Sequence, residues 1–334
     1  MNQLSQTLSP TLERLGGVYL LPVIVALIAF VLIGAPSSWV TLTVAGLSMG
    51  MMIFLMASGL SLVFGLMDVL NFGHSAFVSF GAFVAASALA YMAGWIGSES
   101  IWLNLLAIFL AFSAAIAFGL VVGWFFEVVI IKPVYHDHLR QILITMGALI
   151  VSEQIILAVW GGAPVSVPRP AFLEGSWLIG DVTIEIYRAF AFALALAVYV
   201  ALYLVLKHTR IGLLIRAGVE NREMVEALGF RIDRLFVGVF MVGSALAALG
   251  GAMWAGYETL ITPALGGEIM IVVFIVVIIG GLGSVEGTLL GAIMVGLMAN
   301  YIGFLAPKLA LASNMLLMMA ILLWRPNGLK PAVK

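Results

Sequence analysis

Four polar side chains interrupt two apolar runs, residues 41–64 and 76–92, each about long enough to cross a bilayer. The interrupting segment, residues 65–75, has glycine at positions 65 and 73 and carries a carboxylate, a carboxamide, an imidazole and a hydroxyl: Asp68, Asn71, His74 and Ser75. In hydrocarbon such groups cost several kcal/mol unless they are paired or hydrated. The segment therefore predicts either a satisfied network of interhelical hydrogen bonds or part of a pathway through a membrane.

The composition indicates the class of protein. Hydrophobic residues make up 63% of the 334 positions and charged residues 9%, against roughly 45–50% and 25% in a soluble domain. We therefore predict an integral helical membrane protein. The absence of cysteine excludes disulfides, thiolate metal sites and cysteine nucleophiles. A metal site is not expected, because His136 and His138 lie in a different loop from His74. The net charge of −1 and the lack of a basic patch give no reason to expect nucleic acid as a partner.

Hydropathy predicts an all-α bundle of about ten transmembrane helices, discontinuous near 65–75 and again near 280–287. The last part of the chain, residues 268–304, fits either two crossings or one broken hairpin. The predicted spans are 18–34, 40–64, 76–93, 102–131, 141–160, 188–206, 234–257, 268–283, 287–304 and 308–324.

The distribution of Lys and Arg predicts the orientation. A cytoplasmic N-terminus places 12 of the 15 basic residues inside and only Arg169, Arg188 and Lys308 outside, as the positive-inside rule requires. Both termini are then cytoplasmic, residues 161–187 form an outer loop, and residues 207–233 form an inner loop. Alternation of apolar and polar residues around Gly180 predicts a hairpin in the outer loop.

The inner loop contains a candidate docking helix, residues 221–229. Asn221 can cap its start and Gly229 can end it in a left-handed conformation. Its apolar residues are expected on one face and its charged residues on the other: Met224, Val225 and Leu228 against Arg222, Glu223 and Glu226. Such a short helix needs a surface to lie on. That surface is either the cytoplasmic end of the same protein or a cytoplasmic partner.

Two further features carry polar groups into apolar surroundings. Residues 280–287 form a glycine-rich break that includes Gly283 and Ser284, and fit either a tight inner turn or a second part of the pathway. Within the span 141–160, Glu153 is a carboxylate in an otherwise apolar helix, where such groups usually face the interior of a bundle. We therefore include Glu153, Gly283 and Ser284 among the candidate path residues.

Four motifs, in this order, resemble the permease family of branched-chain amino-acid ABC importers, most nearly its LivH type. They are the segment 59–74, with its Asn-Phe-Gly-His ending, the segment 216–229, the Gly-Gly-Leu-Gly-Ser run at 280–284, and Arg-Pro-Asn-Gly-Leu at 325–329. The resemblance covers nearly the whole chain. Asp68 and Ser75 depart from the family pattern, which has glycine at both positions.

The resemblance implies a single transmembrane permease domain, residues 1–334, in a bacterial inner membrane. It implies three kinds of partner: a second, LivM-like permease, two cytoplasmic ATPase subunits and a periplasmic substrate-binding protein. The chain itself would be no enzyme and would hold no cofactor, because it lacks a Walker A sequence and the ATPases would bind ATP. The residues that would contact the ATPases are Arg216, Arg222, Glu223, Met224, Glu226, Ala227, Leu228 and Gly229.

Alternatives to this function remain open at the level of the sequence. Related permeases carry urea or short amides and share these motifs. A stand-alone secondary transporter or channel would need coupling-ion sites, for which Asp68, His74 and Glu153 are the candidates. An intramembrane enzyme is the least favoured class, because no serine–histidine pair, paired aspartates or metal-ligand spacing is present.

Overall fold

The computed structural model describes residues 2–67, 69, 71–135, 137–220 and 222–331, with side chains left out at 2–16, 219, 220, 222, 223 and 311. Its long helices are α1 (Asn2–Ile33), α2 (Pro36–Met67), α3 (His74–Tyr91), α5 (Ile101–Phe125), α6 (His138–Trp160), α7 (Ile186–His208), α10 (Ile232–Glu258), α11 (Leu265–Gly280), α12 (Val285–Leu305) and α13 (Ala310–Trp324). Shorter helices are α4 (Ala93–Ile96), the π-helix η1 (Phe126–Ile131), the 3₁₀ turns η2 (Lys132–Val134), η3 (Ala171–Leu173) and η4 (Pro307–Leu309), α8 (Arg210–Glu220) and α9 (Arg222–Ala227). Four short strands complete the fold: β1 (Val165–Ser166), β2 (Ser176–Ile179), β3 (Val182–Glu185) and β4 (Leu260–Ile261).

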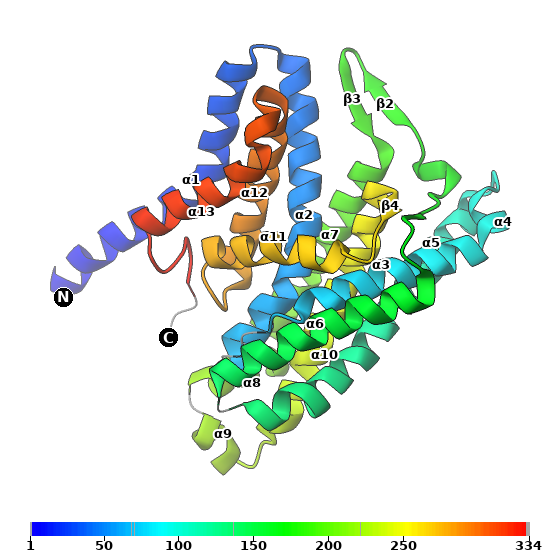
Figure 1. The fold of residues 1–334 in the computed structure, drawn as a ribbon. Helices are drawn as coiled ribbons and strands as arrows, with labels where there is room; N and C mark the ends of the chain where they lie inside the picture. The colour runs from blue at the N-terminus through cyan, green and yellow to red at the C-terminus, as the bar shows by residue number, and fades with distance from the viewer. Residues whose placement is uncertain (1, 68, 70, 136, 221, 332–334) are drawn as a thin grey trace.

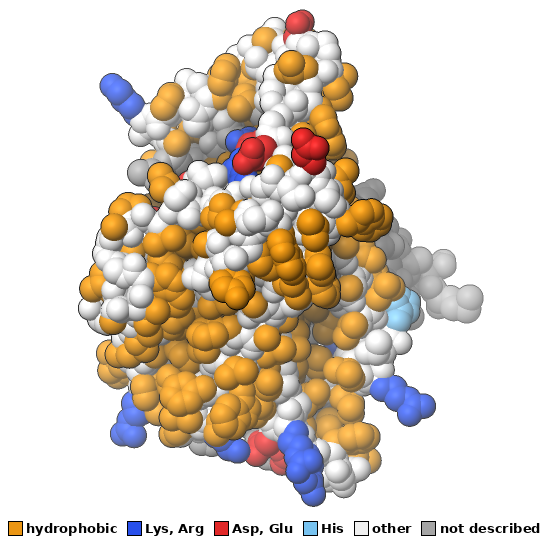
Figure 2. All heavy atoms as spheres, turned by 90° about the vertical axis from the view of Figure 1, so that its right-hand side faces the viewer, with side chains coloured by type: hydrophobic (Ala, Val, Ile, Leu, Met, Phe, Trp, Pro, Cys, Tyr) orange, Lys and Arg blue, Asp and Glu red, His pale blue; other side chains and the backbone are white. Residues whose placement is uncertain are grey.

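The helical membrane fold is confirmed. Among the described residues, 7 helices are long and apolar enough to cross a membrane, and three shorter apolar helices lie at Gly17–Ile33, Leu265–Gly280 and Ala312–Trp324. Together they match the ten predicted spans in position, although the count of ten crossings stays a prediction. Figure 2 shows hydrophobic side chains gathered over the middle of one face, with most of the visible Lys and Arg along its lower edge.

The bundle is built around α2 and α10. In their most apolar windows, 83% of α2 and 72% of α10 are buried, whereas only 17% of α6 and of α7 is buried. α2 packs against α10, α12 and α7, and α10 packs against α3 and α5 (Figure 1). α6 and α7 therefore present most of their surface to whatever surrounds the chain.

Glycines allow the central helices to approach closely. A Cβ atom added to Gly59 of α2 would lie 2.1 Å from the carbonyl oxygen of Gly243 on α10. One added to Gly251 of α10 would lie 2.0 Å from the carbonyl oxygen of Val78 on α3. These are backbone-to-backbone contacts of the small-residue kind that associates helices in membranes.

Both predicted breaks are present. α2 ends at Met67 and α3 begins at His74, and α11 ends at Gly280 and α12 begins at Val285. Asp68 lies outside the described residues. The helix before the first break continues two residues past Gly65, where the sequence places the start of the interruption. His74 and Ser75, which the sequence places in the break, belong to the first turn of α3.

The loops at the two ends of the bundle differ in structure. The predicted hairpin is confirmed: β2 and β3 pair antiparallel from Ser176↔Glu185 to Ile179↔Val182, and Gly180 has a φ of 62°. It projects at the opposite end of the molecule from α8 and α9 (Figure 1). β1 pairs with β4 and so ties the outer loop to the segment between α10 and α11.

Replacing Gly59 with alanine should destabilise the bundle. The added methyl group would force the α2 and α10 backbones apart, and overpacking of this kind costs about 1–3 kcal/mol. Thermal unfolding of the purified chain in detergent should show a lower midpoint for Gly59→Ala. The control is Gly147→Ala on α6, where no described heavy atom lies within 4 Å of the added Cβ. Equal midpoints for the two variants would contradict the close α2–α10 contact.

Candidate functional site

The polar residues of the first break differ in how they are satisfied. His74 Nε2 lies 2.9 Å from the carbonyl oxygen of Met56, within hydrogen-bonding distance. Asn71 is fully buried, yet both side-chain amide atoms lack a partner among the described residues. Ser75 is likewise buried with an unpartnered hydroxyl. A buried polar group without a partner costs about 1–3 kcal/mol. An interhelical hydrogen bond therefore explains the burial of His74. No such bond to a described residue explains the burial of Asn71.

The backbone of this break is held by α6. The N–H of Phe72 donates to Thr145 Oγ1 at 3.1 Å, and Thr145 Oγ1 in turn donates to the carbonyl oxygen of Gln141 at 2.7 Å. At Gly73, an added Cβ would lie 3.0 Å from the carbonyl oxygen of Thr145 and 3.1 Å from the Phe126 ring. Glycine at position 73 lets the unwound chain lie directly against α6 and η1.

The second break is a sharp elbow. Gly281 and Gly283 have φ angles of 98° and 80°, which favour glycine. Ser284 Oγ accepts a hydrogen bond from the Gly287 N–H at 3.1 Å and so caps the start of α12. This contact gives Ser284 a structural role that does not depend on any pathway.

The end of α2 lies against the second break. A Cβ on Gly65, which is in the last turn of α2, would lie 2.7 Å from the Cα atom of Gly283. The fold thus places the turn that leads into the first break beside the second break, far away in the sequence. Backbone that leaves the helix at membrane depth must be buried in protein or line a wet cavity, and the end of α2 covers part of the second break.

Glu153 lies away from this contact, farther along α6. Its Oε1 atom lies 3.2 Å from the position that a Cβ atom on Gly267, in the first turn of α11, would take. Eight residues separate Glu153 from Thr145, which corresponds to about 12 Å along the helix. The structure thus places Gly283 against the end of α2, Phe72 and Gly73 against Thr145 of α6, and Glu153 farther along α6.

Sequence reasoning overlooked Glu127. This residue is buried, with 1% relative exposure, in the π-helix η1, and its Oε2 atom has no partner among the described residues. π-helical turns are frequent at functional sites. The sequence does indicate Glu127, because it is the one carboxylate in the apolar run 102–131. Glu153 was chosen as a candidate for the same reason.

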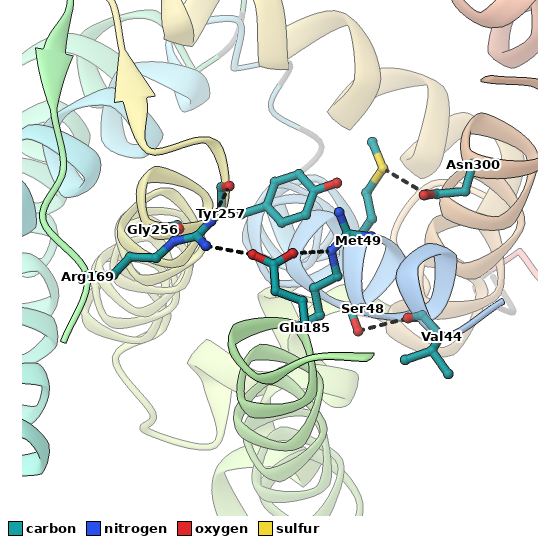
Figure 3. Close-up of polar contacts among 9 residues, drawn as sticks. Val44, Ser48, Met49, Arg169, Glu185, Gly256, Tyr257 and Asn300 are labelled. Atoms are coloured by element: carbon teal, nitrogen blue, oxygen red, sulfur yellow. Dashed lines mark hydrogen bonds and ion pairs between the residues drawn. The ribbon is translucent and has the colours of Figure 1, made fainter. Parts of the chain in front are cut away.

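A second overlooked feature is a clamp at the outer end of α10. Arg169 donates from Nε to the carbonyl oxygen of Gly256 at 2.5 Å and from Nη2 to that of Tyr257 at 2.8 Å (Figure 3). Its Nη1 pairs with Glu185 at 2.6 Å, and Glu185 also pairs with Arg188 at 2.8 Å. The guanidinium satisfies carbonyls at the C-terminal end of α10, where a positive charge is favourable. The outer loop is thereby fixed to the bundle.

The inner loop forms two helices, of which the sequence predicted one. α8 was not predicted, and α9 lies within the predicted segment. Gly229 ends α9 as expected: its φ is 88°, and its N–H donates to Glu226 while the Phe230 N–H donates to Val225, a Schellman pattern. Asn221 lies outside the described residues, as do the side chains of Arg222 and Glu223.

The predicted apolar face of this helix is divided. Met224 and Leu228 are 61% and 71% exposed, whereas Val225 is buried in the main hydrophobic core. The three side chains, which were predicted to lie on one face, therefore meet two different surroundings. Val225 anchors α9 to its own protein, and Met224 and Leu228 remain on the outer surface. Glu226, Ala227 and Gly229 are exposed beside them, and Arg216 is exposed on α8.

The inner loop also contacts the end of α2. A Cβ on Gly218 of α8 would lie 3.9 Å from Leu66 Cδ1 and 3.6 Å from Ile232 Cδ1. Leu66 is next to Gly65, the residue that meets the elbow. A displacement of α8 would therefore move the end of α2, which lies against Gly283.

Comparison with known proteins places this architecture among transport proteins. The family model described as "Branched-chain amino acid transport system / permease component" matches residues 42–324. The high-affinity branched-chain amino acid transport system permease protein LivH of Salmonella typhimurium is 25% identical over 291 residues, which are 85% of this chain and 92% of that protein. LivH of Escherichia coli K12 gives the same values. The corresponding protein BraD of Pseudomonas aeruginosa is 27% identical over 296 residues, 86% and 94% of the two chains.

Among solved structures, an inward-facing ABC transporter assigned to the metal-chelate type aligns with 94% of this chain and 99% of its own. The sequence identity is 17% and the TM-score 0.49.

Replacing Asn71 with leucine should leave the stability of the chain unchanged or raise it, because the amide makes no hydrogen bond to the described residues that the substitution would remove. His74→Ala should lower stability, because it removes a hydrogen bond that is worth about 0.6 kcal/mol in membranes and empties a packed site. The measurement is thermal unfolding in detergent of both variants beside the wild type. A loss of stability in Asn71→Leu as large as that in His74→Ala would show that Asn71 stabilises the bundle through interhelical hydrogen bonds.

Proposed function

Because the chain belongs to the family of branched-chain amino acid transport system permease components, we propose that it forms the membrane path of an ATP-driven importer for branched-chain or related amino acids. The chain is a transport subunit with several membrane-spanning helices. The observation that carries the proposal is the contact of Gly65 with Gly283, which places the end of α2, where the first break begins, beside the second break of an apolar bundle. Unwound backbone and polar side chains are destabilising in an apolar environment. A bundle with only a structural role would not require them.

The path we propose follows the face formed by α3, α6, α11 and the elbow. Six residues would line or shape this path: Asn71, His74, Ser75, Glu153, Gly283 and Ser284. Asn71 and Ser75 support it most directly, because their polar atoms are buried without partners among the described residues and would be free to bind a solute once the path opens. His74 and Ser284 would shape the path, since each already holds a neighbouring segment.

The inner loop would dock to the ATPases. The exposed Met224 and Leu228, one turn apart at the end of α9, form a small apolar patch with the exposed Glu226 between them in the sequence, and Arg216 is exposed on the preceding helix α8. Mixed charge around an apolar patch suits a groove on a protein surface better than an anionic lipid surface. Two cytoplasmic ATPase subunits, a second permease of the LivM type and a periplasmic binding protein would complete the importer in a bacterial inner membrane. Both termini and the loop 207–233 would then be cytoplasmic, in agreement with the positive-inside rule.

The coupling step we propose begins at α9. Closure of the ATPases on ATP would press on Met224 and Leu228, and the buried Val225 would carry the displacement into the bundle. The contact of Gly218 with Leu66 would pass it to the end of α2 and so to the two breaks. A change in the angle between α2 and α12 at this point would alternate access to the path. ATP hydrolysis itself would take place in the partner subunits.

Replacing Leu228 with arginine should uncouple the permease from the ATPases. The side chain is 71% exposed, so the substitution should not affect folding, but it would place a charge in the apolar contact. We expect the co-purified amount of ATPase subunits to fall by about ten-fold. Leu178→Arg, at an exposed position of the outer hairpin, is the control and should leave this association intact. Normal co-purification and normal ATP turnover in Leu228→Arg would refute the docking assignment.

Replacing Asn71 with leucine should lower uptake of L-leucine by about ten-fold in proteoliposomes that contain the assembled importer. The path would lose its free amide, while folding and assembly should not change. Co-purification of all subunits is the control for assembly. Uptake at the wild-type rate would remove Asn71 from the path and leave the two breaks with a structural role.

A further inference from the structure

Charged and aromatic side chains from four separate segments meet at the predicted inner end of the bundle. Lys330, in the tail that follows α13, donates from Nζ to the Tyr19 hydroxyl of α1 at 2.5 Å and pairs with Glu286 in the first turn of α12. The same Nζ atom lies 5.2 Å from the centre of the Tyr19 ring. On α7, Lys207 Nζ donates to the Tyr203 hydroxyl at 2.5 Å.

Tyr199 joins the two parts of this cluster. It lies one turn before Tyr203 on α7, and the centroids of the two rings are 6.1 Å apart. Its hydroxyl interacts electrostatically with Glu286 and Lys330. The ammonium group of Lys207 interacts electrostatically with the same two residues. The two lysines therefore belong to one cluster, although they are far apart in the sequence.

The cluster keeps a net positive charge and free donors. It has two ammonium groups, those of Lys207 and Lys330, and one carboxylate, that of Glu286. Lys207 is exposed, and the side chain of Lys330 is 29% exposed. An ammonium group has three donor hydrogens, of which Lys330 uses two and Lys207 one on the described residues. Both lysines can therefore donate to an acceptor from outside the chain.

Beyond the cluster, the two helices that carry it present apolar surface. On α1, Leu20, Val23 and Leu27 are 56%, 52% and 57% exposed, and on α7, Leu196 and Val200 are 40% and 44% exposed. Tyrosine and lysine next to such a surface are typical of the boundary between hydrocarbon and water. A molecule held by the lysines would lie partly against apolar side chains, which suits a lipid better than a water-soluble anion.

We propose that Lys207 and Lys330 bind the phosphate group of an anionic phospholipid in the leaflet on the side of the two termini. Two ammonium groups from different segments can hold one phosphate between them, and the hydroxyls of Tyr19 and Tyr203 position them. The acyl chains lie along the apolar surfaces of α1 and α7. A zwitterionic lipid brings a cationic group of its own, which gains nothing from a net positive cluster. Basic pockets between transmembrane helices bind anionic headgroups in this way.

The bound lipid would also hold the second break. The N–H of Lys330 donates to the carbonyl oxygen of Gly280 at 3.0 Å, and the N–H of Leu329 donates to that of Ile279 at 2.8 Å. The tail that carries Lys330 thus satisfies the last carbonyls of α11, directly before the elbow. A headgroup that fixes Lys330 fixes this tail, and with it the end of α11. This role does not depend on which solute the chain transports.

Native mass spectrometry of the full chain, purified in a non-ionic detergent, tests the site. The dissociation constant of the first bound lipid is measured for dioleoyl phosphatidylglycerol and for dioleoyl phosphatidylcholine. We expect the wild type to bind phosphatidylglycerol about five-fold more tightly, and Lys207→Gln to lose about five-fold of this affinity, because one basic residue at an anionic headgroup contributes a factor of this size. The matched control is Lys132→Gln, which removes another inner lysine that is 50% exposed and should leave the constant unchanged.

A variant with an effect of opposite sign separates lipid binding from loss of folding. Glu286→Gln removes the carboxylate of the cluster and should strengthen binding of phosphatidylglycerol by about five-fold, which a misfolded chain would not do. Equal constants for the two lipids, a loss in Lys132→Gln as large as in Lys207→Gln, or weaker binding in Glu286→Gln would each overturn the site. Displacement of the lipid by excess inorganic phosphate would show a site for free phosphate and would overturn the lipid assignment.

Discussion

The contact of Gly65 with Gly283 is the constraint on which the rest of the structure depends. No side chain separates the two backbones there, because a Cβ on Gly65 would lie 2.7 Å from Gly283 Cα. Through this contact the last turn of α2 covers part of the unwound segment between α11 and α12, whose polar backbone groups need burial or water in an apolar environment. Close packing of α2 with α10, through Gly59 and Gly243, fixes the helix that carries Gly65.

Loops at the two ends of the bundle are fixed to the helices around this contact. At the inner end, Gly218 of α8 packs on Leu66, and the buried Val225 ties α9 to the core. At the outer end, Arg169 fastens the loop 161–187 to the last carbonyls of α10. The loop 161–187 is thus held by charged groups, and the loop 207–233 by apolar contacts.

The sequence was sufficient for the features that local chemistry determines. Gly229 ends α9, the residues around Gly180 turn the outer hairpin, and glycine-rich segments break α2–α3 and α11–α12. It was insufficient where tertiary packing decides. The burial of Val225 beside the exposed Met224 depends on where the bundle lies, and the clamp at Arg169 depends on carbonyls 87 and 88 residues away. Glu127 could have been predicted as Glu153 was, because both are lone carboxylates in apolar helices.

The central claim is that motion of the inner loop reaches the two breaks. Hydrogen exchange of the assembled importer, followed by mass spectrometry with and without trapped ATP, tests it most directly, because it reports on backbone amides in both places at once. The account predicts that ATP changes protection in α8 and α9 and also at residues 71–73 and 281–284. A change confined to residues 207–231, with both breaks unaffected, would contradict it.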